Sequence, residues 1–222
     1  MHFSLYMFLI VFVMIVSFIN CQPDHSHLSF CQIKNAMYPN EFLYTCRDRN
    51  MNDFNRKVYT NPPYSKYMNG FFQMGWVFEP VNDGQNNTYH LINVQYEEYL
   101  CASDLHLDVL RLRRKVNTVR INKYDMNGFS GDNKNDSTSV GNSLVGIYDY
   151  QNSCKWRLQS LSGGDPDKYM IWNVKFNEPL YAASFLFKMA KSNRRNVYLW
   201  HKKPDSLQFV WFINCFQNSK FD

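Results

Sequence analysis

The sequence contains three copies of one pattern, and this internal repeat constrains the fold more than any other feature. The clearest match aligns WVFEPVNDGQNNTYHLINVQYEEYLCAS, which begins at Trp76, with WRLQSLSGGDPDKYMIWNVKFNEPLYAAS, which begins at Trp156. A more diverged copy, CQIKNAMYPNEFLYTC, begins at Cys31. Self-similarity of this kind indicates one supersecondary unit used repeatedly, because a single unit cannot bury its apolar face alone.

The three copies share landmarks in the same order. One inserted residue in the first copy brings all of them into register, and the distance from the shared Leu to the shared Arg varies little. The landmarks are Asn35, Asn93 and Asn173; Tyr38, Tyr96 and Phe176; Glu41, Glu98 and Glu178; Leu43, Leu100 and Leu180; Arg56, Arg114 and Arg195; Val58, Val116 and Val197; and Trp76, Trp156 and Trp211.

Each unit is predicted to form four short strands. Apolar and polar residues alternate at 89–94 and 197–200, and aromatics make up 17% of the chain, which favours strands. The connectors SGGDPD and NDGQNN are turn signals, and no segment has a long, capped helical period.

Three units of four strands predict an all-β protein with the β-trefoil architecture of twelve strands. In this fold a six-stranded barrel is closed at one end by three hairpins, and no sheet edge stays open. We expect units at about 28–80, 81–160 and 161–218, with an insertion at about 119–148 in the second. A propeller or a solenoid usually needs more copies.

The N-terminus carries an uncharged, apolar run from Phe3 to Ile19, followed directly by polar residues. This pattern is typical of a cleaved signal peptide. We expect cleavage after Cys21, so that residues 1–21 are the signal and residues 22–222 form one secreted, extracellular domain. A signal anchor is the alternative, because the run approaches the length of a membrane span.

Five cysteines follow the expected cleavage site, and an oxidising compartment should pair four of them. Cys31 and Cys215 flank the first and last strands, so their pairing would hold the chain ends together. Cys101 and Cys154 lie within one unit and form the second expected pair. Cys46 is left over and is expected to be a buried, inert thiol, with intermolecular pairing as the alternative.

Two N-glycosylation sequons lie in polar segments, at Asn86 and Asn135. The only close histidine pair, His25 and His27, lacks further ligands, so we expect no metal and no cofactor. No catalytic signature is present, and we expect no enzyme activity. Paired carboxylates for glycoside chemistry would be one reading of Glu41, Glu98 and Glu178, but their threefold placement favours structural capping beside tight turns.

Basic residues cluster unevenly, and the net charge of +5 is compatible with anionic partners. Arg114 and Arg195 occupy the repeat position and read as scaffold. The less constrained basic residues are the candidate ligand-binding residues, against the alternative of a solvated charged face. They are Arg111, Arg113, Lys202 and Lys203. Aromatics that would stack on sugars include Tyr64, Tyr67 and Tyr150.

The order of motifs resembles the β-trefoil superfamily over residues 28–218. Ricin-type lectins carry Gln-x-Trp in each unit, whereas Cys154-Lys155-Trp156 lacks the Gln, and the N-terminal signature of soybean-type Kunitz inhibitors is missing. The stretch NVKFNEPLYAAS…RRNVYLW…FVWFI is most similar to secreted arthropod trefoil proteins of saliva and haemolymph, including the trefoil half of moth haemolymph storage lipoproteins. That resemblance implies ligand binding, storage or host interaction without catalysis.

Two functions follow as expectations. The first is a secreted binding protein for glycans or another extracellular ligand, and the second is a protease inhibitor or effector that acts on a partner protein. We expect a monomer with no nucleic-acid partner and no membrane association after signal cleavage.

Overall fold

The computed structural model describes residues 29–49, 55–63, 71–82, 84–106, 112–121, 152–161, 167–186, 194–201 and 206–216. All of them belong to one compact unit, Ser29–Gln217. The predicted signal peptide and most of the predicted insertion lie outside the described residues. No helix in the described ranges is long and apolar enough to cross a bilayer.

The described part of the chain contains twelve strands, two short 3-10 helices and two helical residues at 152–153, which confirms the all-β class. The first unit comprises β1 (Phe30–Asn35), β2 (Phe42–Arg49), β3 (Arg56–Asn61), η1 (Phe71–Met74) and β4 (Gly75–Pro80). The second comprises β5 (Thr88–Asn93), β6 (Glu98–His106), β7 (Arg113–Val119) and β8 (Lys155–Ser160). The third comprises β9 (Lys168–Asn173), β10 (Glu178–Leu186), β11 (Arg195–Trp200), η3 (Leu207–Phe209) and β12 (Val210–Phe216).

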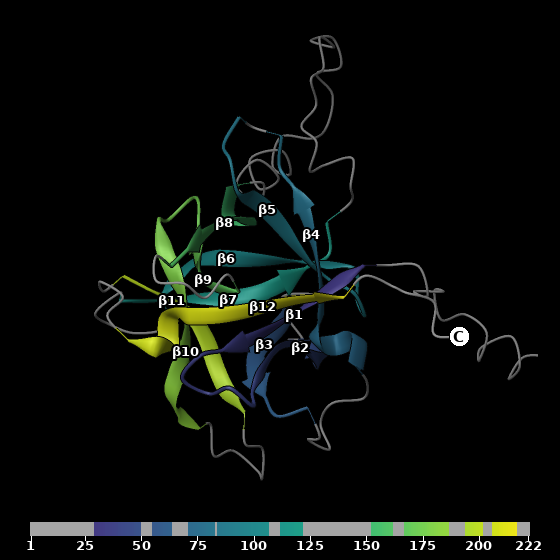
Figure 1. Ribbon diagram of the computed structural model, residues 1–222, viewed down its shortest axis with the longest axis vertical. Coiled ribbons are helices and arrows are strands. Elements are labelled where there is room, and N and C mark those ends of the chain that lie inside the picture. The colour runs from purple at the N-terminus through teal and green to yellow at the C-terminus, as the bar shows by residue number, and fades with distance from the viewer. Residues whose placement is uncertain are drawn as a thin grey trace, which may run out of the picture. The chain divides into compact units, whose positions relative to one another are not determined.

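The strand pairings repeat in each unit. The first and fourth strands of every unit pair in the closed order β1, β4, β5, β8, β9, β12, and β12 returns to pair with β1 (Figure 1). The second and third strands form the hairpins β2–β3, β6–β7 and β10–β11. The strands β3, β7 and β11 also pair with one another, so the three hairpins meet.

The repeated tryptophans anchor these hairpins to the barrel. Trp76, Trp156 and Trp211 are fully buried. Their indole N–H groups donate to the backbone carbonyls of Leu43, Leu100 and Leu180 at 3.0, 2.8 and 3.0 Å. Each bond joins a barrel strand to a hairpin strand of the same unit, and each satisfies two polar groups that would otherwise be buried without a partner.

The repeated asparagines join the first strand of each unit to the segment before the fourth strand of the preceding unit. Each side-chain amide donates to a carbonyl that lies three residues before a repeated Trp, at 2.9, 2.9 and 2.8 Å for Asn35, Asn93 and Asn173. The asparagines are fully buried, so their amides must be paired for the fold to be stable. Leucine, valine and tryptophan landmarks of all three copies fill the common core.

The repeated glutamates join neighbouring units. The guanidinium Nε of Arg56 donates to Glu98 at 3.1 Å, that of Arg114 to Glu178 at 2.9 Å and that of Arg195 to Glu41 at 2.9 Å. The arginine comes from the third strand of one unit, and the glutamate begins the second strand of the next or, for Glu41, directly precedes it. The glutamates are therefore structural, as expected, but they bind an arginine of the preceding unit instead of capping a turn.

Each of these three arginines makes two contacts besides its ion pair, one with an aromatic ring and one with a backbone carbonyl. Each guanidinium lies over an aromatic ring of the next unit, with Cζ 3.8, 4.0 and 3.6 Å from the ring centroids of Tyr96, Phe176 and Tyr38. Each also donates to a backbone carbonyl of its own unit, at Arg47, Asp104 or Ser184. Ion pair, ring and carbonyl together fix the direction of the side chain.

The structure contains the two disulfides expected from the sequence, Cys31–Cys215 and Cys101–Cys154. The first joins β1 to β12 and the second joins β6 to the segment before β8. Among the described cysteines only Cys46 is free, and it is buried beside Tyr44, Tyr59 and Met74.

Glu98→Gln is expected to destabilise the protein by about 3 kcal/mol, because it leaves the largely buried Arg56 without a counter-charge. Chemical denaturation would measure the change. The matched control is Glu97→Gln at the neighbouring exposed position, which should change the free energy of unfolding by less than about 0.5 kcal/mol. Equal effects of the two substitutions would contradict a structural role for the ion pair.

Cys46 is expected to resist thiol reagents in the native protein, because burial keeps the reagent away from its sulfur. In denaturant without a reductant it should react as a single thiol, while the four disulfide cysteines stay protected. Rapid labelling of the native protein, measured by mass spectrometry, would show that the thiol is accessible.

Candidate functional site

The structure pairs β7, which carries Arg113, with β11, whose last described neighbour His201 directly precedes the basic pair Lys202-Lys203 in the sequence. In the antiparallel register Arg113 lies opposite Trp200, and Lys115 lies opposite Tyr198. Just beyond the strands, the backbone N–H of His201 donates to the carbonyl of Leu112 at 3.0 Å.

Of the four candidate ligand-binding residues, the structure describes Arg113 alone. Arg111, Lys202 and Lys203 lie outside the described residues. Arg111 directly precedes Leu112 in the sequence, and Lys202 directly follows His201. The described residues that adjoin the two basic segments are therefore hydrogen-bonded to each other.

One face of this strand pair combines cations with aromatic rings, and we call it the β7–β11 face. It consists of the partly buried Arg113, Lys115 and Trp200 together with the buried Tyr198. Along the two strands they alternate with the junction residue Arg114 and with core residues. The guanidinium of Arg113 lies 5.4 Å from the ring centroid of Tyr198. Cations beside aromatic rings favour ligands that carry both anionic groups and apolar faces.

Aromatic packing holds Trp200 in place. Its ring meets the ring of Tyr181 edge-on, with the centroids 4.5 Å apart, and also lies near those of Tyr198 and Phe209. Trp200 itself is only partly buried. Burial raises the pKa of Tyr181 to about 12, so this phenol stays neutral at physiological pH and adds no charge to the face.

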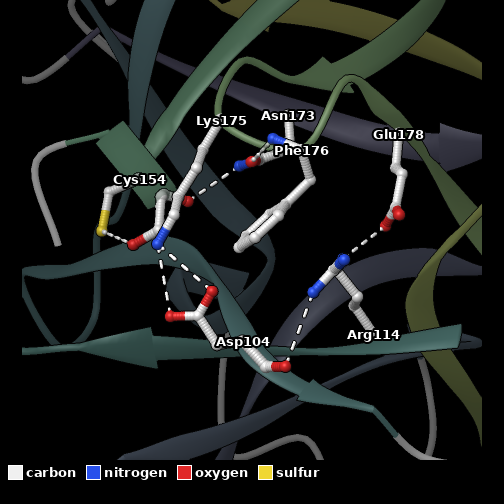
Figure 2. Close-up of polar contacts among 8 residues, drawn as sticks. Asp104, Arg114, Cys154, Asn173, Lys175, Phe176 and Glu178 are labelled. Carbon is white, nitrogen blue, oxygen red and sulfur yellow. Dashed lines mark hydrogen bonds and ion pairs between the residues drawn. The ribbon is translucent and has the colours of Figure 1, made fainter. Parts of the chain in front are cut away.

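The opposite face of β7 forms the junction between the second and third units. Figure 2 shows Arg114 between Glu178 and the backbone carbonyl of Asp104, with Phe176 beside them. The ammonium of Lys175 lies 3.2 Å from the carboxylate of Asp104 and 4.9 Å from the ring centroid of Phe176. This second ion pair also joins the two units.

This junction departs from the other two in how the glutamate is satisfied. Thr60 donates its hydroxyl to Glu41 at 2.6 Å, and Thr118 donates to Glu98 at 2.7 Å. The repeat places Leu199 where the third threonine would be. Glu178 instead has His201 beside its second oxygen, at 3.4 Å, and the His201 side chain is 73% exposed.

A second polar contact is also replaced at this junction. Gln73 donates to the hydroxyl of Tyr96 at 2.8 Å, and Gln208 donates to that of Tyr38 at 3.2 Å. At the third junction the aromatic is Phe176, which has no hydroxyl, and Ser153 occupies the glutamine position. The glutamine donor and the tyrosine hydroxyl acceptor are thus both absent from this junction. Its additional polar contacts are made instead by two exposed residues, His201 and Asp104.

Other predicted features lie away from this region or outside the described residues. Tyr64, Tyr67, Tyr150, His25, His27 and Asn135 all fall in the ranges without described positions. Asn86 is exposed between β4 and β5. Within the described ranges no group of three or more His, Cys, Asp or Glu residues is placed to hold a metal ion.

A separate aromatic cluster lies where β1 begins and β12 ends. Phe71, Phe72 and Phe216 are 49%, 37% and 43% exposed, and their rings surround the buried ring of Phe30. This cluster is the most exposed group of packed aromatic rings among the described residues. It carries no charged side chain of its own.

Reasoning from the sequence missed several residues of the site. It found the alternation at 197–200 but did not place Trp200 beside Arg113, because strand register across the hairpins is not encoded in spacing along the chain. No sequence pattern pointed to Asp104 or Lys175, since neither is a landmark shared by the three copies. His201 becomes notable only when Leu199 is compared with the threonines of the other copies.

No protein-family model matches the chain, and no curated protein matches it in sequence. Solved structures do match. A Caenorhabditis elegans protein with unknown function is 10% identical, with a TM-score of 0.55 and coverage of 86% of this chain and 98% of that one. The designed threefold-symmetric protein ThreeFoil is 12% identical, with a TM-score of 0.52 and coverage of 83% and 97%.

A lectin from Polyporus squamosus, solved with the epitope Neu5Aca2-6Galb1-4GlcNAc, is 14% identical, with a TM-score of 0.52 and coverage of 84% of this chain and 48% of the lectin. These likenesses show the fold alone: the chain shares its all-β fold with these proteins, and the β-trefoil architecture predicted from the repeat is compatible with it. The finer resemblance to arthropod proteins of saliva and haemolymph stays a prediction.

Arg114 and Arg113 are neighbours with different expected roles. Arg114→Ala should cost about 3 kcal/mol of stability, because it leaves the buried carboxylate of Glu178 without its cation. Arg113→Ala should cost less than about 1 kcal/mol, because Arg113 is only partly buried and lies on the β7–β11 face instead of in the junction between units. Thermal and chemical unfolding of both variants would measure this, and a larger loss for Arg113→Ala would contradict the assignment.

Proposed function

We propose that the chain is a complete β-trefoil of three pseudo-symmetric units, secreted from the cell, that binds an extracellular glycan carrying acidic groups without catalysing a reaction. The proposed binding surface is the β7–β11 face. The observation that carries this proposal is the register that sets Arg113 opposite Trp200 and joins Leu112 to His201.

The chemistry of the face suits such a ligand. Arg113 and Lys115 supply positive charge, and Arg supplies paired donors that match a carboxylate or a sulfate. The partly exposed ring of Trp200 offers an apolar plane on which the C–H face of a sugar can stack. The basic residues Arg111, Lys202 and Lys203 adjoin this face in sequence and would extend the positive charge.

Two further observations support the proposal. Both disulfides fit an oxidising, extracellular environment. The fold is shared with a lectin that was solved in complex with an oligosaccharide containing Neu5Ac, a sugar with a carboxylate. Because the repeat residues are committed to the scaffold, a ligand is expected to bind where the three units differ, and the β7–β11 face is one such place.

The β7–β11 face is tested by charge reversal. Arg113→Glu combined with Lys115→Glu should weaken retention on immobilised heparin and lower the affinity for acidic glycans about tenfold, or ~1.4 kcal/mol. The matched controls are the single reversals Lys115→Glu and Lys57→Glu, which make the same charge change at corresponding positions of the second and first units. Retention should fall as salt rises, because the contacts are ionic.

The result that contradicts the proposal is specific. If the wild-type protein passes through heparin at low salt and gives no signal on a glycan array, binding of an acidic glycan is excluded. If Lys57→Glu weakens retention as much as Lys115→Glu does, binding reflects the net charge of the protein rather than the β7–β11 face.

The alternative function is inhibition of, or another action on, a partner protein such as a protease. The observation that favours it is the exposed aromatic cluster of Phe71, Phe72 and Phe216, because aromatic residues are enriched at protein interfaces. Screening the protein against a protease panel would test inhibition. A panel without inhibition, together with retention on heparin that depends on Arg113, would leave the glycan-binding function.

A further inference from the structure

Thr88 places a hydroxyl where the fold does not need one. It begins β5, is only 2% exposed, and its Oγ1 has no hydrogen-bond partner among the described residues. A buried hydroxyl without a partner costs stability, on the order of 1–3 kcal/mol. Such a group in a well-packed structure calls for a reason outside the packing.

The other two copies show that the scaffold does not require threonine at this position. Counting back from the repeated asparagines, the residues equivalent to Thr88 are Phe30 in β1 and Lys168 in β9. Phe30 is buried in an aromatic cluster, and Lys168 lies over the ring of Phe212. The equivalent residue is apolar in one copy and charged in the other, so neither copy depends on a hydroxyl at this position.

Thr88 is also the third residue of the sequon Asn86-Asn87-Thr88. Asn86 is exposed in the turn that joins β4 to β5. The next residue, Asn87, has a left-handed φ of 62°, and its carbonyl accepts a bond of 2.9 Å from the N–H of Leu158. The turn is therefore held against β8 while the Asn86 side chain faces solvent.

We propose that Asn86 carries an N-linked glycan and that the glycan is attached before β5 forms. This inference rests on the proposed secretion, because the transferase acts in the secretory pathway. The amide nitrogen Nδ2 of Asn86 attacks the anomeric carbon of an oligosaccharide held on a lipid diphosphate. A C–N bond forms, the bond from that carbon to the diphosphate oxygen breaks, and Nδ2 loses one proton.

The burial of Thr88 sets the order of events. The transferase reads the hydroxyl two residues after the asparagine, and in the folded protein that hydroxyl is inside the structure. Recognition must therefore come before β5 pairs with β4 and β8. On this account Thr88 serves modification during synthesis, and the folded protein retains the unpaired hydroxyl afterwards.

The occupancy test uses the full chain expressed in a eukaryotic secretory cell line, with peptide mapping before and after enzymatic removal of N-glycans. The wild type and Thr88→Ser should carry the glycan on the peptide that contains Asn86. Asn86→Gln and Thr88→Val should lack it. Asn135→Gln should leave the occupancy of Asn86 unchanged.

Thr88→Val separates modification from folding. Valine has nearly the shape of threonine without the hydroxyl, so the variant should fold and should be at least as stable as Asn86→Gln in chemical denaturation. A Thr88→Val protein that is clearly less stable than Asn86→Gln would show that the hydroxyl serves the fold, and it would overturn the inference.

The timing is tested in a cell-free system that contains microsomes. Glycan should be added when the chain is translated in their presence. None should be added when folded, unmodified protein is mixed with detergent-opened microsomes, and modification of that folded protein would overturn the proposed order.

Failure of this inference is distinguishable from failure of the proposed function. Secreted protein with an unmodified Asn86 that still binds heparin overturns the inference alone. Secreted, glycosylated protein that binds no glycan overturns the binding function alone. An unmodified chain that stays in the cytosol contradicts both the inference and the proposed secretion.

Discussion

The pairing of an arginine from one unit with a glutamate of the next is the interaction on which the rest of the structure depends. Arg56 reaches Glu98, Arg114 reaches Glu178 and Arg195 reaches Glu41, so the three bonds form a closed cycle. The glutamates are almost fully buried, and the arginine that neutralises each of them comes from the preceding unit. No unit completes its own polar contacts, which ties the stability of each unit to the presence of the other two.

One pair of equivalent positions outside the central core is filled differently in the three units. Outside the central core, the first unit packs Tyr44 with Met74, and the third packs Tyr181 with Phe209. The equivalent residues of the second unit are the disulfide-bonded Cys101 and Cys154. A covalent bond thus occupies the place of apolar contacts where the side chains are too small to fill the space.

Much of the scaffold was predictable, because the residues that recur in all three copies mark the positions that the shared fold requires. Aligning the copies identified the buried asparagines, leucines and tryptophans, and the positions of the cysteines predicted both disulfides. The sequence did not reveal that Glu41 binds Arg195 or that Trp200 lies opposite Arg113, because these contacts depend on which strands meet around the barrel axis. The substitution of Leu199 for threonine is visible in the alignment, but its effect on Glu178 and His201 requires coordinates.

The pairing of β1 with β12 has a consequence for how the chain can be connected. These strands match over six residue pairs, from Phe30 opposite Phe216 to Asn35 opposite Trp211, and a disulfide joins them. The barrel therefore contains no seam that distinguishes its first strand from its last. A circularly permuted chain that starts at β5 or β9, with the natural ends linked, would contain every pairing described above. The strand pairings therefore do not depend on which strand comes first in the chain.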